Sequence, residues 1–502
     1  MIFQTKRIDL ESTLCFFLKS FLFLFPWQTI WIYREIFVNG VKMEYATLGF
    51  YATEILLWAA VLLFIVWYWK KWKREKSKWK IRFRLTKDRI FITACLSLIS
   101  YLFISIVWSP DKSLALQQSL RVMEAFLLFF IFTLGPLKFN EAVKWLALGA
   151  VLPSMLGIWQ FFSQSTFAFK WLGLAEHIVS NPGASVIVGD EIGRWLRSYG
   201  PFAHPNVLGG YAAMVIVLML LKLKDCKACP EQSRRTERLP FYLFISYLLS
   251  LIFIISVIFF SFSRSALLAL IIIILLNCYI VFKQKKFSYL PSAALDSPRD
   301  GSLRTSLSLI SCLILPIIIL SVLLFPALKT RVTVSSSYEV ASVVERAQGF
   351  NEGWEIFKDN KWLGVGAGNY IAYLQKIDPD RQSWEYQPVH NAGLLLLAEM
   401  GLFGVALLFF VLLSLISFLF SLVTNQESQV DACKRSRKIT VFCYLPARHR
   451  LRHQVLAGGC SVFCYFVLAF FDHYLISSYT GLILTGIFFG LALKHSREVV
   501  PS

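Results

Sequence analysis

A histidine at the edge of an apolar run is the first residue in this sequence that suggests chemistry. His390 and Asn391 stand directly before the run in "HNAGLLLLAEMGLFG". An imidazole can exchange protons near neutral pH, and an asparagine at this position can cap a helix or orient a substrate. His390 is therefore a candidate general base, and the alternative is an interfacial histidine that only ends a helix.

Three arginines are candidates for binding an anionic group. Arg264 opens the apolar run of "SFSRSALLAL", where an ionisable residue indicates either function or a side chain that reaches the membrane interface. Arg197 precedes His204 and Asn206 in "RWLRSYGPFAHPNVLGG", where loop-and-cap structure is the alternative. Arg346 lies in "VVERAQGFNEGW", where the alternative is a surface salt bridge. Guanidinium groups bind phosphate or pyrophosphate through forked donors.

The elements that carry these residues are expected to be membrane helices. Of 502 residues, 56% are hydrophobic and 16% are charged, and the mean hydropathy is +0.59. Soluble domains carry about a quarter charged residues. Many apolar runs here reach the roughly 20 residues that cross a bilayer, and they are continuous rather than alternating. The sequence therefore predicts an all-α, polytopic helical membrane protein.

We expect about twelve transmembrane helices. Their approximate positions are 14–36, 46–69, 90–108, 113–134, 144–162, 205–222, 241–260, 264–282, 306–327, 391–422, 455–472 and 479–494. A long extracytoplasmic loop, 328–389, separates the ninth from the tenth. Its part 338–358 has the apolar spacing of a helix that caps the bundle or lies against the membrane face.

Basic residues set the expected orientation. Counting spans puts the basic segments on one side of the membrane: 70–89, 222–238, 283–304, 424–453 and the C-terminal "KHSR". The positive-inside rule makes that side cytoplasmic, with both termini inside. The net charge of +20 then reflects loops that touch anionic lipid headgroups, and we expect no nucleic-acid partner.

The opposite face receives two long loops, 163–204 and 328–389. Neither contains a cysteine, and the ten cysteines imply no disulfide framework. "GVGAGN", 364–369, lacks the Gly-Lys-Ser/Thr ending of a phosphate loop, so we expect a tight glycine turn. Asp472 and His473, in "FDHYL", can orient a partner, although packing is the simpler expectation.

This topology puts Arg197, Arg264, Arg346 and His390 on the outer face. Arginines around one histidine suit an anionic donor whose leaving group must be stabilised, while the histidine takes a proton from an attacking hydroxyl. An outward-facing membrane site with these parts suits a lipid-linked pyrophosphate whose tail lies in the bilayer.

Several stretches resemble the O-antigen ligase and polymerase family. "HNAGLLLLAEMGLFG" fits the ligase pattern of His, then Asn, Ser or Gln, nine residues, Gly, two residues and Gly. "SFSRSALLAL" is similar to the family's Ser-Arg-small segment at a helix mouth, and "ERAQGFNEGWEIFKDNKWLGVGAGNY" to its outer-loop segment. "YGPFAHPNVLGGY" is similar to the stretch before its core spans. The resemblance covers roughly 195–425 closely, and the whole chain by span number.

The resemblance implies a metal-independent glycosyltransferase with a GT-C-like membrane fold and no cofactor. Such enzymes take a glycan from undecaprenyl pyrophosphate on the outer face of the inner membrane and pass it to an acceptor hydroxyl. His390 matches the family's proposed base, and Arg264 and Arg346 match the arginines proposed to hold the pyrophosphate. Motif proximity and topology add Arg197 to this set. The supporting residues are Asn391, His204 and Asn206.

The sequence divides into three segments and leaves the acceptor open. These are N-terminal helices with the first outer loop (1–194), an O-antigen ligase-related core with the outer loop 328–389 (195–425), and C-terminal helices (426–502). Ligase, polysaccharide polymerase and protein O-glycosyltransferase share the residue pattern, so the acceptor is a glycan, a lipid or a protein. A transporter or flippase for the lipid-linked glycan is the rival class, but it predicts midplane charges and matching halves, which are not evident here.

Overall fold

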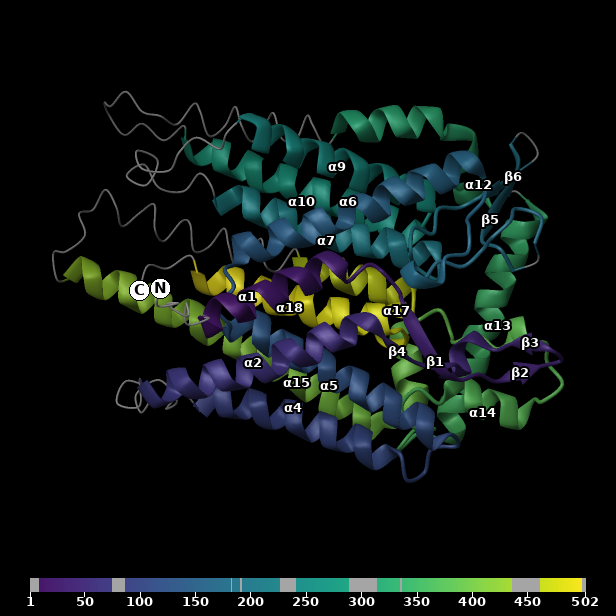
Figure 1. Ribbon diagram of the computed structural model, residues 1–502, viewed down its shortest axis with the longest axis horizontal. Coiled ribbons are helices and arrows are strands. Elements are labelled where there is room, and N and C mark those ends of the chain that lie inside the picture. Colours follow the sequence, from purple (N-terminus) through teal and green to yellow (C-terminus); the bar gives the residue numbers. More distant parts are fainter. Residues whose placement is uncertain are drawn as a thin grey trace, which may run out of the picture. The chain divides into compact units, whose positions relative to one another are not determined.

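The computed structural model describes residues 9–74, 86–181, 183–189, 192–225, 241–288, 314–334, 336–435 and 461–498. Helices dominate these residues (Figure 1). By length and composition, five described helices can cross a membrane, or up to six if one pair bent by 80° is a single span. The five are Ala52–Arg74, Lys112–Leu134, Phe139–Ser163, Pro205–Lys222 and Ala392–Ser417. The prediction of a helical membrane protein is confirmed.

The count of twelve spans stays a prediction. Further apolar helices cover 89–105, 246–261, 264–276 and 461–471, but these are shorter. The expected spans 306–327 and 455–472 begin outside the described residues. Most of the basic segments used to orient the chain also lie outside them, and so does the end of the C-terminal segment 426–502.

The chain divides into two compact units. Unit 1 comprises Met1–Leu146, Glu345–Lys438 and Ala469–Ser502. Unit 2 comprises Ala147–Val344 and Ile439–Leu468. Two helices continue from one unit into the other, namely α6 (Phe139–Ser163) and α13 (Ser337–Asp359). Helix α13 confirms the helical segment that the apolar spacing of 338–358 predicts.

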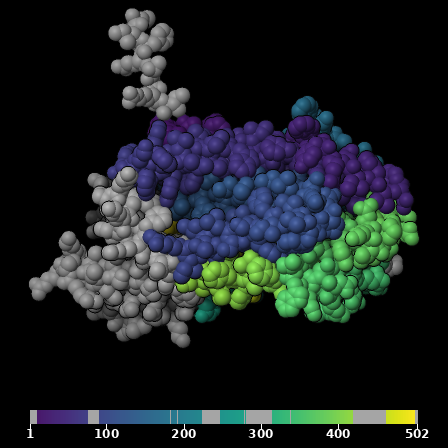
Figure 2. Space-filling view, turned by 90° about the horizontal axis from the view of Figure 1, so that it is seen from below, coloured from purple at the N-terminus to yellow at the C-terminus, as the bar shows by residue number. Residues whose placement is uncertain are grey.

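Unit 1 is built from pairs of long helices. The pairs are α1 (Leu10–Leu24) with α2 (Ala52–Arg74), α4 (Thr86–Ser105) with α15 (Ala392–Arg435), and α5 (Lys112–Leu134) with α18 (Tyr479–Glu498). Figure 2 shows α4 in blue alongside the yellow-green surface of α15. Close packing of α18 on α5 depends on Gly486, because a Cβ there would collide with the carbonyl of Ala125. Asp111 starts α5 by accepting hydrogen bonds from the amides of Ser113 and Leu114.

The first expected span, 14–36, is wrong in its second half. Helix α1 ends at Leu24, next to Pro26, and the chain continues as strand β1 (Ile30–Arg34). Strand β1 pairs antiparallel with β4 (Leu48–Tyr51), and β2 (Phe37–Val38) pairs with β3 (Val41–Lys42). The residues of β1 alternate between half-buried and exposed, as a strand with one covered face does. Its β-branched and aromatic residues suit a strand as well as they suit a membrane helix.

This strand segment packs against the long outer loop within unit 1. Buried Met43, Ala46 and Leu48 share one apolar cluster with Tyr370 and Leu374 of α14 (Tyr370–Ile377). The Ser383 hydroxyl donates to the Lys42 carbonyl at 2.8 Å. Figure 1 shows β2, β3 and α14 at the same end of the unit. The segment 42–48 therefore packs against residues 370–383 within unit 1.

Unit 2 holds a hairpin and a second group of helices. Strands β5 (Val186–Gly189) and β6 (Gly193–Leu196) form the hairpin. Helix α7 (Pro205–Asp225) begins at Pro205, which confirms the expected first turn, and packs on α9 (Phe241–Ser261) and α10 (Arg264–Ser288). A helix over 314–323 bends into α12 (Phe325–Thr333), which contacts β5.

Candidate active site

The residues directly before α15 fix where His390 lies. The Asn391 side chain accepts a hydrogen bond from the Leu394 amide at 2.8 Å, so it caps the helix as its residue type predicts. The same side chain donates to the Phe470 carbonyl at 3.0 Å. Asn391 thus ties the start of α15 to the segment that contains Asp472.

Gly401, in the apolar run, breaks α15, and the predicted glycine turn packs against this break. Gly401 has φ +62°, and a Cβ there would collide with the carbonyl of Trp362. The turn lies in this break: the Val365 amide donates to the Ala398 carbonyl at 3.0 Å, and the Gly366 amide to the Glu399 carbonyl at 2.9 Å. The tight glycine turn is confirmed. Its role is to anchor the helix that follows His390.

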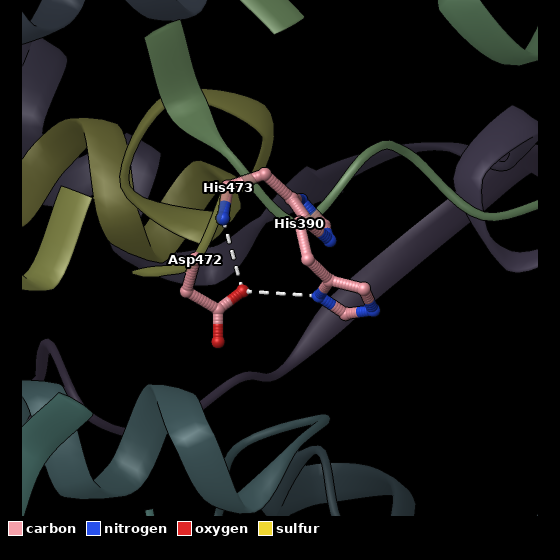
Figure 3. Close-up of side chains that lie close together, drawn as sticks. All are labelled: His390, Asp472 and His473. Atoms are coloured by element: carbon pink, nitrogen blue, oxygen red, sulfur yellow. Dashed lines mark hydrogen bonds and ion pairs between the residues drawn. The ribbon is translucent and has the colours of Figure 1, made fainter. Parts of the chain in front are cut away.

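His390 faces a carboxylate and a second histidine (Figure 3). Its Nδ1 lies 3.7 Å from Oδ1 of Asp472, and the Asp472 side chain is 5% exposed. That oxygen also accepts a hydrogen bond from the His473 amide at 2.9 Å. The His390 and His473 rings lie 5.3 Å apart. Because Asp472 faces Nδ1, it favours the tautomer that carries the proton there and leaves Nε2 as the base.

His473 is held as a neutral neighbour of His390. Its Nδ1 is 2.7 Å from the Ser477 hydroxyl, and its side chain is buried. The pKa of His473 is lowered to about 4, mainly by burial; His390 and Arg346 also lower this pKa, and the negative charge of Asp472 opposes them. A neutral His473 adds no repulsion when His390 takes up a proton.

Arg346 and Tyr45 complete the surroundings of the histidine pair in unit 1. Arg346, on α13, is close enough to act on the charge of His473. Tyr45 packs edge-on against the His473 ring, with the centroids 5.8 Å apart. Arg346 and His390 therefore both lie close to His473.

The spacing of His390, Asp472 and His473 is also compatible with a metal site. Donor atoms of His390, Asp472 and His473 all lie within 4.8 Å of one another. At His473 the positive charge of Arg346 disfavours a cation, whereas the negative charge of Asp472 favours one. The Ser477 hydrogen bond also occupies one nitrogen of His473. The arrangement is compatible with proton transfer, the role that the sequence predicts for His390.

Arg197, His204 and Asn206 lie close together within unit 2. Arg197 is 6% exposed and donates through Nε to the Ser261 carbonyl at 2.7 Å and through a terminal nitrogen to Asn206 at 2.6 Å. His204 accepts from the Asn206 amide at 3.1 Å and lies 3.0 Å from the Ser185 hydroxyl. Arg197 is thus held against the turn that precedes Arg264.

Arg264 has a buried acidic partner that the sequence analysis did not identify. Its guanidinium pairs with Glu339, whose side chain is fully buried, and Glu339 also pairs with Arg331 at 2.7 Å. Arg331 further donates to the Phe262 carbonyl at 3.3 Å. These residues all belong to unit 2, whereas His390 and Arg346 belong to unit 1.

The apolar helices indicate a helical integral membrane protein. Residues 249–409 match the family model for O-antigen ligase, a stretch that contains Arg264, Arg346 and His390. This part of the chain is therefore similar to O-antigen ligases. No curated protein matches the chain.

Proposed function

We propose that the protein transfers a glycan from undecaprenyl pyrophosphate to an acceptor hydroxyl on the outer face of the inner membrane, with both chain termini in the cytoplasm. In this proposal His390 is the general base, oriented by Asp472. Arg346, Arg264 and Arg197 bind the pyrophosphate, and Asn391, His204 and Asn206 hold these residues in place. Membrane lipids surround a GT-C-like bundle of about twelve spans.

The pairing of His390 with Asp472 is the observation that carries the proposal. A separation of 3.7 Å between Nδ1 and Oδ1 is too long for a full hydrogen bond but short enough for an ion pair once the ring is protonated. Catalytic hydrogen bonds often tighten only when substrate binds. Asp472 is therefore suited to stabilise the imidazolium that proton uptake creates.

The proposed step balances as a single displacement. His390 Nε2 takes the proton of the acceptor hydroxyl, whose oxygen forms a bond to the anomeric carbon of the donor sugar. The bond from that carbon to the pyrophosphate oxygen breaks, and the pyrophosphate leaves with the electron pair. Preorganised guanidinium groups stabilise the growing negative charge, so the reaction needs neither a metal nor a cofactor.

The orientation of His390 by Asp472 favours glycan transfer over transport of the lipid-linked glycan. A transporter binds its cargo without breaking a bond and has no need of a base with an oriented tautomer. Ligase, polymerase and protein O-glycosyltransferase all use the same displacement and differ in the acceptor. We propose O-antigen ligase activity first because residues 249–409 match the family model for O-antigen ligase and the histidine segment fits the ligase pattern.

Transfer in membrane vesicles tests the proposal. Vesicles that contain the protein, a labelled undecaprenyl-pyrophosphate glycan and a candidate acceptor are compared with vesicles of His390→Ala, Arg346→Ala and Arg264→Ala at equal protein levels. Product on a lipid A core indicates a ligase, longer chains on the carrier a polymerase, and product on protein a protein glycosyltransferase. Movement of the label across the bilayer without transfer would support a transporter instead.

A further inference from the structure

The helix over 314–323 and α12 form a sharp bend in unit 2. Together the two helices are long and apolar enough for one membrane span, but they meet at 80°. Pro326 lies in the first turn of α12. Because proline has no amide hydrogen and its ring collides with the preceding turn, it prevents the first helix from continuing straight. The bend therefore follows from the sequence.

The direction of the first helix sets the direction of α12. The helix over 314–323 lies in the expected ninth span, and its exposed side chains are all large and apolar, namely Leu315, Ile318, Ile319, Val322 and Leu323. With the usual tilt of about 20° for a membrane helix, α12 then lies within about 30° of the membrane plane. Helix α12 also contacts β5, in the loop 163–204 that is predicted to be extracytoplasmic (Figure 1). The bend is therefore expected at the outer surface of the membrane.

The polarity of α12 is the reverse of that of a helix on a water-facing surface. Phe325 and Val332, seven residues apart and so on one face, are 61% and 80% exposed. Val332 is the most exposed large hydrophobic side chain in the described part of the chain. On the opposite face Ala327 is buried, and Arg331 donates to Glu339 at 2.7 Å. A water-facing helix has its polar side chains outside, so the outer face of α12 suits an apolar surrounding.

The first turns of α13 repeat this reversed polarity. Glu339 is fully buried, whereas Val340, Val343 and Val344 are exposed. Their spacing of three and four residues puts the valines on one side of the helix. The apolar outer surface of α12 therefore has a counterpart on α13 within unit 2.

Lys329 indicates the depth at which this surface lies. It is exposed, four residues after Phe325 and three before Val332, and so shares their face of α12. A lysine between two apolar side chains suits the boundary of a bilayer, because its stem lies along the acyl chains while its ammonium reaches the lipid phosphates. A protein that covered this face would have to supply a carboxylate for the same ammonium.

We infer that α12 is an interfacial membrane anchor, whose partner is the lipid of the outer leaflet. Phe325 and Val332 lie among the acyl chains just below the headgroups, and Lys329 contacts the lipid phosphates. The anchor adds a contact in the plane of the membrane to those of the spanning helices. It holds the start of α13 at the depth of the headgroups, and it does not depend on glycan transfer.

Depth-dependent fluorescence quenching tests the inference. A dansyl-bearing amino acid replaces Val332 in the full-length protein, which is placed as a single copy in nanodiscs of phosphatidylethanolamine and phosphatidylglycerol. Lipids brominated on the acyl chain near the headgroup should quench the dansyl group at least about twofold more strongly than aqueous iodide does. The same probe in place of Glu176, an exposed residue of the outer loop in the same unit, is the matched control and should be quenched mainly by iodide.

Three outcomes would overturn the inference. Quenching mainly by iodide would show that position 332 faces water, and quenching by neither agent in single-copy discs would show that protein covers it. Stronger quenching by lipids brominated near the chain ends would show that α12 dips into the bilayer core. If the probe at position 332 prevents folding, the same measurement with the probe in place of Phe325 decides. None of these measurements involves a glycan or a pyrophosphate, so their outcome is separate from that of the proposed function.

Discussion

The imidazole of His390 and the carboxylate of Asp472 face each other across 3.7 Å, although they come from segments far apart in the sequence. Asp472 is also fixed by the amide of its neighbour His473, so it has little freedom to turn away. A buried carboxylate that faces one nitrogen of a half-exposed histidine sets which nitrogen carries the proton.

Replacing Asp472 with asparagine tests this orientation. The Asp472→Asn variant keeps the shape of the side chain but loses the charge that stabilises protonated His390. We expect kcat to fall while the KM for the donor changes little, because the affected interaction strengthens only in the transition state. The loss should stay within the ~10²–10⁴-fold that a general base contributes. Asp380→Asn, an exposed residue of the outer loop, is the control and should leave both constants unchanged.

Gly401 should be intolerant of any side chain. Its φ of +62° disfavours other residues, and a Cβ would collide with the Trp362 carbonyl. We expect Gly401→Ala to lower the free energy of unfolding by about 1–3 kcal/mol for the strained backbone alone. Thermal unfolding in detergent measures this. Gly349→Ala provides the comparison, because a Cβ at Gly349 meets nothing within 4 Å, and equal melting of the two variants would refute the role of the break.

His473 should make the protein less stable in mild acid. Burial holds its pKa at about 4, compared with 6.5 when it is unperturbed. As the pH falls from about 6.5 towards 4, the unfolded chain binds a proton at His473 that the folded protein does not, so the free energy of unfolding decreases. Melting temperatures at pH 7 and pH 5 should differ more for wild type than for His473→Gln. An identical pH dependence in both proteins would show that His473 titrates normally.

Removal of divalent metals should leave transfer unaffected. His390, Asp472 and His473 have metal-compatible spacing, but the charge of Arg346 acts on the same group. We expect equal transfer rates with and without a strong chelator. Activity that is lost with the chelator and restored by one particular divalent ion would instead make the three residues a metal centre.

Local patterns predicted much of what the structure contains. Four predicted features depend only on neighbouring residues. They are the cap by Asn391, the helix start at Pro205, the helix over 338–358 and the glycine turn at 364–369. Such features follow from side-chain type and spacing within a few residues. The sequence could thus show where His390 stands on its helix.

Pairings between distant segments were not predictable in the same way. Asp472 was expected to pack, because nothing near it in the sequence indicates that it faces His390. Glu339 pairs with Arg264, which lies 75 residues away in the sequence, and with Arg331. The sequence predicts a span over β1, because four of its five residues are hydrophobic. Each of these depends on tertiary contacts that one sequence does not reveal.

The most direct test of the account is the rate of glycan transfer by His390→Gln, measured beside donor binding in the same preparation. Glutamine keeps a polar side chain of similar reach but cannot accept a proton near neutral pH. The account predicts that binding of the undecaprenyl-pyrophosphate donor is nearly unchanged, while transfer falls by ~10²-fold or more. Transfer at the wild-type rate in a folded His390→Gln protein would contradict the central role given to His390.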